Sequence, residues 1–515
     1  MARIDWLRDG GRLALIRNGL RGVEKETLRV GNDGRLSHRP HPMSWGAALT
    51  HPYITTDYSE ALPELVTPPQ RTHWETLQVL CDVHAFIARR LDGELLWPAS
   101  MPCELPPDDG IPIAYYGPSN IGRMKTVYRH GLGHRYGRAM QAIAGVHFNY
   151  SLPAAFWAEY AAHERSKEPL RDFRSAELMG LVRNYRRCAW LVTYLFGGSP
   201  ALCRSFRPDG HELLTELDPA TWYAPFATSL RMSDLGYQNK TQARLSIRAN
   251  SLAEYMAGMH SAVTTEEPGY AAIGVVVDGD YRQLNANILQ IENEYYSTIR
   301  PKPSKASKRR PLAALAHDGI EYVEVRTLDL SSADPVGMNQ NELRFIEALL
   351  VYCLLAESPP ISDDEQAEID ARGLKVAREG RRPGFSFVDG GRERSLRERG
   401  LELTHGIRAV AELLDVDGQG YVSAVDSAVE VLRDPERTPS AMLLAALKTE
   451  QASFFEYTLE LARSHAAYFR DFALRGEREQ ALETAARRSH EEAEALASQD
   501  PRSFEAYLRD YFAET

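Results

Sequence analysis

The sequence predicts an α+β protein in which a part that carries strands is followed by a helical part. Short runs of alternating apolar and polar residues recur through the first two thirds of the chain, for example GVEKETLRV at 22–30. From about residue 349 onward the chain instead carries charged, Ala-rich segments with helical periodicity, such as 476–496. We therefore expect a core of strands and helices over residues 1–355. A helical part over residues 356–515 is expected to pack on that core.

Composition narrows the class of protein. The 515 residues carry a formal net charge of -11, which argues against nucleic acid as the main partner because phosphate binding needs a basic surface. No run of 18 apolar residues occurs, and the first 22 residues contain only the short apolar segment LALI, so we expect neither a membrane partner nor a signal peptide. The five cysteines form no C-x-x-C pair, which fits unpaired thiols in a reducing cytoplasm. We expect small-molecule substrates and, as the simplest state, a monomer.

Two acidic residues stand out in the first strand-like run. Glu24 and Glu26 lie two positions apart, so a strand places both side chains on one face, roughly 7 Å apart. Two carboxylates at that distance repel by about 2 kcal/mol at an intermediate dielectric constant. Three explanations remain open: a face in water, neutralisation by an Arg or Lys, or a bound divalent cation.

Other strand-like runs repeat this arrangement. In AGVHFNYSL (144–152), His147 and Asn149 share one face, and in GIEYVEVRTLD (319–329) Glu324 and Arg326 share a face with apolar neighbours. A charged pair on so apolar a face is expected to bind a ligand or to form an internal ion pair.

A further acidic segment is THPYITTDYSEALPELVTP (50–68). It supplies Asp57 and Glu64, with Pro63 expected to break the regular ladder just before Glu64. The acidic residues and the histidine all lie in short strand-like contexts rather than on charged helices. Carboxylates with one imidazole suit Mg²⁺ or Mn²⁺, which bridge phosphates.

One loop is strongly basic in this acidic protein. The segment RPKPSKASKRRP (300–311) holds three prolines and six Lys or Arg residues. It is expected to be a solvated loop, and a contact with a phosphate or nucleotide is the alternative.

Three short motifs only partly match known patterns. GPSNIGRMKT (117–126) lacks the Lys and hydroxyl of a P-loop, and DVDGQGYVSAVD (415–426) lacks two preferred ligands of an EF-hand. The pair in HGLGH (130–134) lacks the Glu of a zinc-binding H-E-x-x-H helix. None of the three is expected to bind its usual ligand.

Longer motifs carry a resemblance to a known family. They are GVEKETLRV, ALTHPYITTDYSEALPELVTP, WPASMPC, YYGPSNIGRMKTVYRHGL, MQAIAGVHFNYSLP, FATSLRMSDLGY, NILQIENEYY and GIEYVEVRTLD. In this order they resemble glutamate–cysteine ligase of the proteobacterial type, from about residue 15 to about residue 355. The resemblance implies ATP-dependent synthesis of γ-glutamylcysteine through γ-glutamyl phosphate, the first step of glutathione biosynthesis.

The resemblance also implies a fold and a set of functional residues. It implies a curved antiparallel sheet of the glutamine synthetase type, flanked by helices, whose concave face holds Mg²⁺ or Mn²⁺, ATP and amino acids. The implied metal ligands are Glu24, Glu26, Asp57, Glu64, His147 and Glu324. Arg326 and Arg231 are the implied catalytic residues, with Arg326 at the transferred phosphoryl group. Glutamate is assigned to Gln141, Asn149 and Arg231, and cysteine to Tyr128, Arg129, Tyr237 and Tyr296.

Two expectations follow for the segment NILQIENEYY (287–296). Glu292 and Glu294 are expected to lie on a strand, and a turn or bulge is expected to end that strand before Tyr296. Two rival functions stay open at this point: a sister ligase that joins glutamate to another amine, and a non-catalytic interaction protein.

Overall fold

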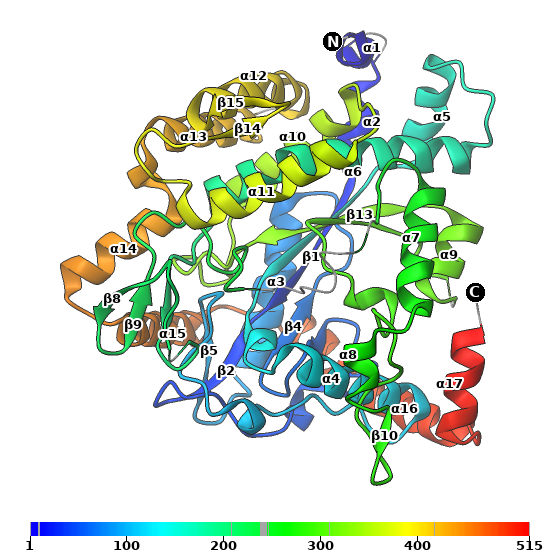
Figure 1. Ribbon diagram of the computed structural model, residues 1–515, viewed down its shortest axis with the longest axis vertical. Coiled ribbons are helices and arrows are strands. Elements are labelled where there is room, and N and C mark those ends of the chain that lie inside the picture. Colours follow the sequence, from blue (N-terminus) through cyan, green and yellow to red (C-terminus); the bar gives the residue numbers. More distant parts are fainter. Residues whose placement is uncertain are drawn as a thin grey trace.

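The computed structural model describes residues 2–8, 11–207, 209–236, 245, 247–307, 309–416 and 418–513. Its centre is an antiparallel six-stranded sheet with the strand order β12-β13-β6-β1-β4-β3 (Figure 1). In chain order these strands are β1 (Leu20–Glu26), β3 (Ile54–Thr56), β4 (Pro63–Val66), β6 (Val146–Ser151), β12 (Ile299–Lys302) and β13 (Tyr322–Leu328). The mixture of this sheet with many helices confirms the predicted α+β class.

Short strands form four smaller sheets around the central one. These strands are β2 (Leu28–Gly31) with β5 (Glu94–Trp97), β7 (Ala201–Cys203) with β9 (Thr221–Tyr223) and β8 (Thr215–Asp218), β10 (Val276–Val277) with β11 (Asp280–Tyr281), and β14 (Ser386–Asp389) with β15 (Arg392–Ser395).

Helices make up most of the remaining chain. Those before the last third are α1 (Ala2–Arg8), α2 (Leu13–Arg17), α3 (His73–Ala88), α4 (Asn120–Tyr136), α5 (Ala154–His163), α6 (Leu170–Phe196), α7 (Leu252–Thr264), α8 (Pro268–Ala271), α9 (Pro311–Asp318) and α10 (Gln340–Leu355). Those of the last third are α11 (Asp363–Glu379), α12 (Leu396–Leu414), α13 (Tyr421–Arg433), α14 (Pro439–Glu450), α15 (Phe454–Asp471), α16 (Gly476–Gln499) and α17 (Phe504–Ala513).

One face of the central sheet is covered by α3, α6 and α10. Helices α3 and α10 each begin with a capping box, Thr72 with Glu75 and Asn339 with Glu342, which satisfies backbone N–H groups at the helix start. Helix α3 contacts β1 and β4, helix α6 contacts β12 and β13, and α10 packs on both helices. Apolar strand residues such as Val23 are therefore fully buried on this face. The alternation of the strands leaves the polar residues for the opposite face.

The helical tail packs back onto the part of the chain that carries the sheet. Helices α12 and α13 contact α10, helix α15 contacts α3 and β5, and α17 contacts α4 (Figure 1). Arg310, at the end of the basic loop, lies 4.7 Å from the ring centroid of Tyr511 on α17. The division into two domains near residue 355 stays a prediction.

Three local expectations were wrong. The run 22–30 is not one strand, because Thr27 separates β1 from β2, which pairs with β5 instead. Pro63 begins β4 rather than breaking a ladder, since the first position of a strand tolerates a residue without an N–H. Residues Glu292–Glu294 form a 3₁₀ turn and not a strand. The hairpin of β14 and β15 in the helical tail was not predicted at all.

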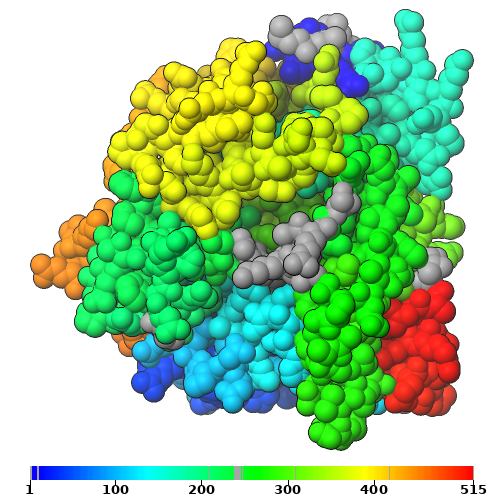
Figure 2. Space-filling model, viewed as in Figure 1, coloured from blue at the N-terminus to red at the C-terminus, as the bar shows by residue number. Residues whose placement is uncertain are grey.

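The molecular surface is hollowed on one side (Figure 2). In the space-filling view a recess lies between the yellow segment around α11 and α12 and the green segment around α7 (Figure 2). Of the described helices, none is both long and apolar enough to cross a membrane.

Candidate active site

Four strands of the central sheet bring the predicted metal ligands together. In the strand register Glu26 lies opposite Glu64, and Glu24 lies opposite His147. Glu324 lies opposite Asn149 on the next pair of strands. Predicted ligands from four separate strands thus become neighbours on one face.

The side chains confirm that these groups are close. Ligand atoms of Glu24, Glu64 and His147 all lie within 4.8 Å of one another. His147 Nδ1 lies 3.4 Å from Glu24 Oε2 and 3.5 Å from Glu324 Oε1, and its Nε2 lies 3.8 Å from Glu26 Oε1. We call Glu24, Glu26, Asp57, Glu64, His147 and Glu324 the acidic cluster.

Asp57 is also part of this cluster, but it lies in a turn and not on a strand. It follows β3, and its charge is close enough to raise the pKa of Glu26 and of Glu64. Arg129 on α4 donates hydrogen bonds to the carbonyl oxygens of Asp57 and Thr56, the latter at 3.5 Å. Arg129 therefore holds the backbone of the turn that carries Asp57.

Three basic side chains reach the acidic cluster. Arg326 Nη1 donates to Glu324 Oε1 at 2.7 Å, and Lys302 Nζ lies 2.8 Å from Glu324 Oε2. Lys305 Nζ lies 3.8 Å from Glu24 Oε1. The basic loop at 300–311 is thus in contact with the cluster, a contact that its sequence alone does not predict.

These basic side chains do not neutralise all of the acidic groups. Burial opposes ionisation of Glu24 and Glu324, but hydrogen bonding from His147 to Glu24 and the charge of Lys302 near Glu324 lower both pKa values, that of Glu24 to about 2. Burial and the charge of Asp57 raise the pKa of Glu26 to about 8. Burial and the charge of Glu24 raise the pKa of Glu64 well above 4.5. The ionised forms of Glu26 and Glu64 are therefore disfavoured in the chain alone.

This donor set fits divalent cations. Carboxylates and one imidazole converge on a small volume, and the raised pKa values show that further positive charge is favoured there. Asn149 beside the cluster donates to Glu24 Oε1 at 3.1 Å, while its own Oδ1 has no hydrogen-bond partner among the described residues. This amide oxygen is therefore available to accept a hydrogen bond from a ligand.

A second arginine is held rigidly at the edge of the cluster. The carbonyl oxygen of Arg326 accepts a hydrogen bond from Arg231 Nη2 at 3.0 Å, and Asp329 Oδ1 lies 3.6 Å from Arg231 Nη1. Asp329 is itself fixed by Ser199 Oγ at 2.6 Å and by Ser229 Oγ at 3.0 Å. Sequence reasoning missed Asp329, although it ends the motif that contains Glu324 and Arg326.

A glycine makes room for this arginine. A Cβ atom on Gly145 would stand 2.2 Å from Arg231 Nη2, which is far inside van der Waals contact. Any larger residue at position 145 would displace the guanidinium. The backbone just before β6 therefore helps to define the position of Arg231.

The remaining predicted residues lie around this centre. Gln141 is buried in a 3₁₀ turn before β6, and Tyr128 lies on α4 one position before Arg129. Tyr296 lies after the 3₁₀ turn at 292–294, with its hydroxyl 3.2 Å from Met232 Sδ. Tyr237 lies outside the described residues.

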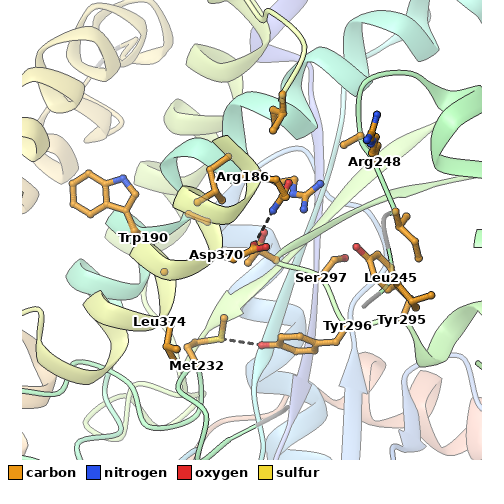
Figure 3. Close-up of a pocket in the computed structure, with 18 of the residues that line it drawn as sticks. Arg186, Trp190, Met232, Leu245, Arg248, Tyr295, Tyr296, Ser297, Asp370 and Leu374 are labelled. Carbon is orange, nitrogen blue, oxygen red and sulfur yellow. Dashed lines mark hydrogen bonds between the residues drawn. The ribbon is translucent and has the colours of Figure 1, made fainter. Parts of the chain in front are cut away.

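Tyr296 also lines a large cavity. This cavity of about 560 Å³ lies between α6, α11 and the segments around 247–250 and 295–298 (Figure 3). Tyr296 and Met232 lie at one end of it, and Met232 directly follows Arg231 in the sequence. Arg186 and Asp370 lie on its helical walls. Its volume is in the usual range for small-molecule sites.

Comparison with known proteins identifies the family. A family model described as glutamate-cysteine ligase matches residues 4–376, and relatives with that name match the tail as well. The ligase of Azotobacter vinelandii is 46% identical over 99% of this chain and 97% of its own length, and that of Alcanivorax borkumensis is 45% identical over 99% and 98%.

Solved structures agree with the sequence relatives. The crystal structure of glutamate–cysteine ligase from Francisella tularensis in complex with AMP superposes with a TM-score of 0.91 at 34% identity, over 96% of this chain and 98% of that chain. A bifunctional glutathione synthetase from Pasteurella multocida shares the fold, with a TM-score of 0.72 at 23% identity over 91% of this chain and 55% of that chain. The chain belongs to the glutamate–cysteine ligase family.

Proposed function

We propose that the acidic face of the sheet joins the γ-carboxylate of glutamate to the amino group of cysteine. The γ-carboxylate first attacks the γ-phosphorus of ATP, which gives γ-glutamyl phosphate and ADP. The amine of cysteine then attacks the acyl carbon, and phosphate leaves from γ-glutamylcysteine. This is the ATP-dependent reaction of the family and the first step of glutathione biosynthesis. The observation that carries the assignment is the acidic cluster beside Arg326 on one sheet face.

We assign Mg²⁺ or Mn²⁺ to the acidic cluster, with Glu24, Glu26, Asp57, Glu64, His147 and Glu324 as ligands. The divalent cations would neutralise phosphate oxygens and orient ATP for in-line transfer. The chain contributes by holding the ligands on rigid strands. Arg129 contributes through the backbone of Asp57.

Two arginines act on the substrates in this proposal. Arg326 meets the transferred phosphoryl group, because its Nη1 already lies against the cluster at Glu324. Arg231 holds a carboxylate of glutamate, with Asn149 and Gln141 as further polar contacts. Lys302 and Lys305 stand where they can meet polyphosphate once divalent cations occupy the acids.

We assign the cysteine end of the site to Tyr128, Arg129, Tyr237 and Tyr296. The cavity beside Tyr296 supports this side as the entrance for an amino acid. Among the described residues, the Arg129 guanidinium donates its hydrogen bonds to backbone carbonyl oxygens. Its contribution to cysteine binding is therefore indirect in this proposal.

Further features of the enzyme remain proposals. We propose that the sheet is of the curved glutamine synthetase type and that residues 1–355 form the catalytic core. All five cysteines are unpaired, which supports a reducing cytoplasm as the site of action. A monomer is sufficient for this mechanism, because the residues assigned to it come from one chain.

A direct assay tests the function. The full-length protein is incubated with Mg²⁺, ATP and glutamate, with cysteine or another amine, and release of ADP and the ligated product are measured. We expect ADP release that depends on cysteine. Release with a different amine only would support the sister ligase, and no ligation with any amine would support an interaction protein.

The conservative variant Arg326→Lys is expected to lower kcat about 100-fold, because a lysine keeps the charge but loses the forked donors that meet a phosphoryl group. The KM for ATP is expected to change less than kcat. Steady-state rates at saturating Mg²⁺ measure both. Arg309→Lys, on an exposed part of the basic loop, is the matched control and should change the rate less than about twofold. A nearly normal kcat for Arg326→Lys would contradict the assignment.

The variant Asp329→Asn tests how Arg231 is positioned. Loss of the carboxylate should let the guanidinium move, and we expect the KM for glutamate to rise about tenfold while the KM for ATP stays nearly constant. Asp92→Asn is the control, since the side chain of Asp92 is fully exposed. Equal rises in both KM values, together with a lower unfolding temperature, would indicate a purely structural role for Asp329.

A further inference from the structure

Helix α17 packs in a small apolar cluster that is separate from the main core. Phe504 and Leu508 of α17 are 2% and 7% exposed, and they pack with Met124 and Val127 of α4 and with Ile291. In the ribbon view α17 lies at the edge of the molecule (Figure 1). Burial of these apolar side chains fixes α17 against the helix that carries two residues assigned to cysteine.

The last turn of α17 lies over Arg310, at the end of the basic loop. The central carbon of the Arg310 guanidinium lies 4.7 Å from the ring centroid of Tyr511 and 5.5 Å from that of Phe512. Nη1 of Arg310 also donates to the carbonyl oxygen of Tyr511 at 3.3 Å. Attraction between a guanidinium and an aromatic face is stronger when water is excluded, and Arg310 is only 7% exposed. We call Tyr511 and Phe512 the aromatic clamp.

Arg310 is held on a second side by an acidic residue. Its Nη2 donates to Glu292 Oε1 at 3.2 Å, and both side chains are 6% exposed. Glu292 begins the 3₁₀ turn at 292–294. A buried ion pair fixes the geometry of its partners, because separating them removes the pairing at a site from which water is largely excluded. Arg310 therefore joins the end of the basic loop to α17 and to this turn.

The other part of the basic loop carries the two lysines that reach the acidic cluster. Lys302 belongs to β12, so the pairing of β12 with β13 fixes its position. Lys305 lies beyond the strand, in a turn at 304–307, and its side chain is 64% exposed. Its Nζ nevertheless lies 3.8 Å from Glu24 Oε1. The position of Lys305 therefore depends on how the loop is held at its two ends, by β12 and by Arg310.

We propose that the aromatic clamp positions the basic loop for ATP: it fixes Arg310 and, through the loop, keeps Lys305 directed at the acidic cluster. This proposal rests on the proposed function, which assigns the polyphosphate of ATP to that cluster. A lysine on a loop loses conformational freedom when it meets a phosphate, and a loop that is fixed in advance loses less. The clamp is therefore expected to act on the affinity for ATP and not on the rate of the chemical step.

Binding of ATP tests the clamp without the ligation reaction. Isothermal titration calorimetry measures the Kd of ATP for the full-length protein in Mg²⁺, without amino acids. The clamp variant, Tyr511→Leu with Phe512→Leu, keeps apolar bulk but loses both aromatic faces, and we expect its Kd to rise about fivefold. The conservative variant Tyr511→Phe keeps both faces and should bind ATP within about twofold of the wild type. An unchanged Kd in the folded clamp variant would overturn the proposal.

Steady-state rates separate this role from an effect on the other substrates. In the clamp variant the KM for ATP should rise about fivefold, while kcat and the KM for glutamate stay within about twofold of the wild type. A rise in the KM for cysteine with no change in the KM for ATP would overturn the proposal. Such a result would mean that Arg310 acts through the turn at Glu292 and not through the basic loop.

A double-variant comparison tests the route through Lys305. Lys305→Met keeps the length of the side chain and removes its charge, and alone it should raise the Kd of ATP about fivefold. Adding the clamp substitutions to Lys305→Met should raise the Kd less than about twofold further, because the contact that the clamp positions is already lost. A further rise of about fivefold, as for independent sites, would overturn the proposal.

Tyr507→Ala is the control for a general loosening of α17. Its ring lies 5.4 Å from the guanidinium carbon of Arg502, on the same helix as the clamp. Its loss should leave the Kd of ATP within about twofold of the wild type. Thermal unfolding establishes that each variant is folded. A rise in Kd equal to that of the clamp variant would overturn the proposal, since any loosening of the helix would then suffice.

The clamp and the proposed function fail in different ways. Weaker ATP binding by the clamp variant, in a protein that ligates no amine, would support the clamp and remove the proposed function. Cysteine-dependent ADP release by the wild type, with equal ATP binding by the wild type and the clamp variant, would support the function and remove the clamp.

Discussion

Glu64→Gln is expected to lower kcat by about 10³-fold at saturating Mg²⁺ and to raise the Mg²⁺ concentration needed for half-maximal rate. The loss follows from the removal of one carboxylate from a set that holds cations against ATP, where each such contact contributes several kcal/mol to the transition state. Glutamine has nearly the same shape, so the strand register of β4 with β1 and β3 should be kept.

The same variant should not destabilise the protein in the absence of divalent cations. Burial and the charges of Glu24 and Asp57 raise the pKa of Glu64, so its ionised form is unfavourable at neutral pH. A neutral amide removes this repulsion, and we expect an unfolding temperature equal to or above that of the wild type without Mg²⁺. With Mg²⁺ the order should reverse, because only the wild type gains the full stabilisation from bound cations.

Glu104→Gln is the control for this experiment, since Glu104 is exposed and its ion pair with Arg35 at 3.5 Å is exposed as well. Its rate and its response to Mg²⁺ should match those of the wild type. A Glu64→Gln enzyme that unfolds more readily without Mg²⁺ would show that Glu64 serves a structural ion pair. If Glu64→Gln turned over substrate at the wild-type rate, Glu64 would not belong to the metal site.

The sequence predicted which side chains share a face but not which strands are neighbours. Period-two spacing placed Glu24 with Glu26 and Glu324 with Arg326, and the structure confirms both pairs on the polar face. The order β13-β6-β1-β4 depends on pairings between distant segments, such as Glu24 with His147 and Glu324 with Asn149, which local spacing cannot specify. The family resemblance, and not the spacing, brought these segments together in advance.

Other contacts could not be predicted because they depend on loops and backbone atoms. Arg129 was assigned to cysteine from its motif, yet its guanidinium meets the carbonyls of Thr56 and Asp57. Lys302 reaches Glu324 only because β12 pairs with β13. A 3₁₀ turn at Glu292–Glu294 replaces an expected strand, and its two carboxylates pair with Arg135 and Arg310 from other segments. Such partners leave no periodic signal in the sequence.

Glu347→Gln is expected to lower the free energy of unfolding by about 3 to 5 kcal/mol, the usual cost of leaving one partner of a buried ion pair alone. Glu347 on α10 is fully buried and accepts a hydrogen bond from Arg21 Nη2 on β1. Its other oxygen lies 2.8 Å from His73 Nε2 at the start of α3 and accepts from the hydroxyl of Tyr421 on α13 at 2.9 Å.

This carboxylate therefore joins the sheet, two helices that cover it and one helix of the tail. A glutamine can still accept hydrogen bonds, but it leaves the guanidinium of Arg21, which is 2% exposed, without a buried counter-charge. Urea unfolding at pH 7 measures the effect. Glu460→Gln is the control, because its pair with Arg463 at 3.4 Å is exposed and should contribute less than about 0.5 kcal/mol.

The pH dependence of unfolding separates the charge of Glu347 from its packing. Burial opposes its ionisation, but Arg21 and then His73 outweigh this and lower the pKa of Glu347 from 4.5 to about 2 in the folded protein. A lowered folded-state pKa contributes stability that is complete above the unfolded-state pKa and is lost as the pH falls from about 4.5 towards 2. The difference in unfolding free energy between wild type and Glu347→Gln should therefore be constant from pH 7 to pH 5 and shrink below pH 4.5. Glutamine does not titrate, so a change of this difference with pH comes from Glu347 of the wild type. A difference that stays constant down to pH 3 would therefore assign the loss to packing rather than to the ion pair.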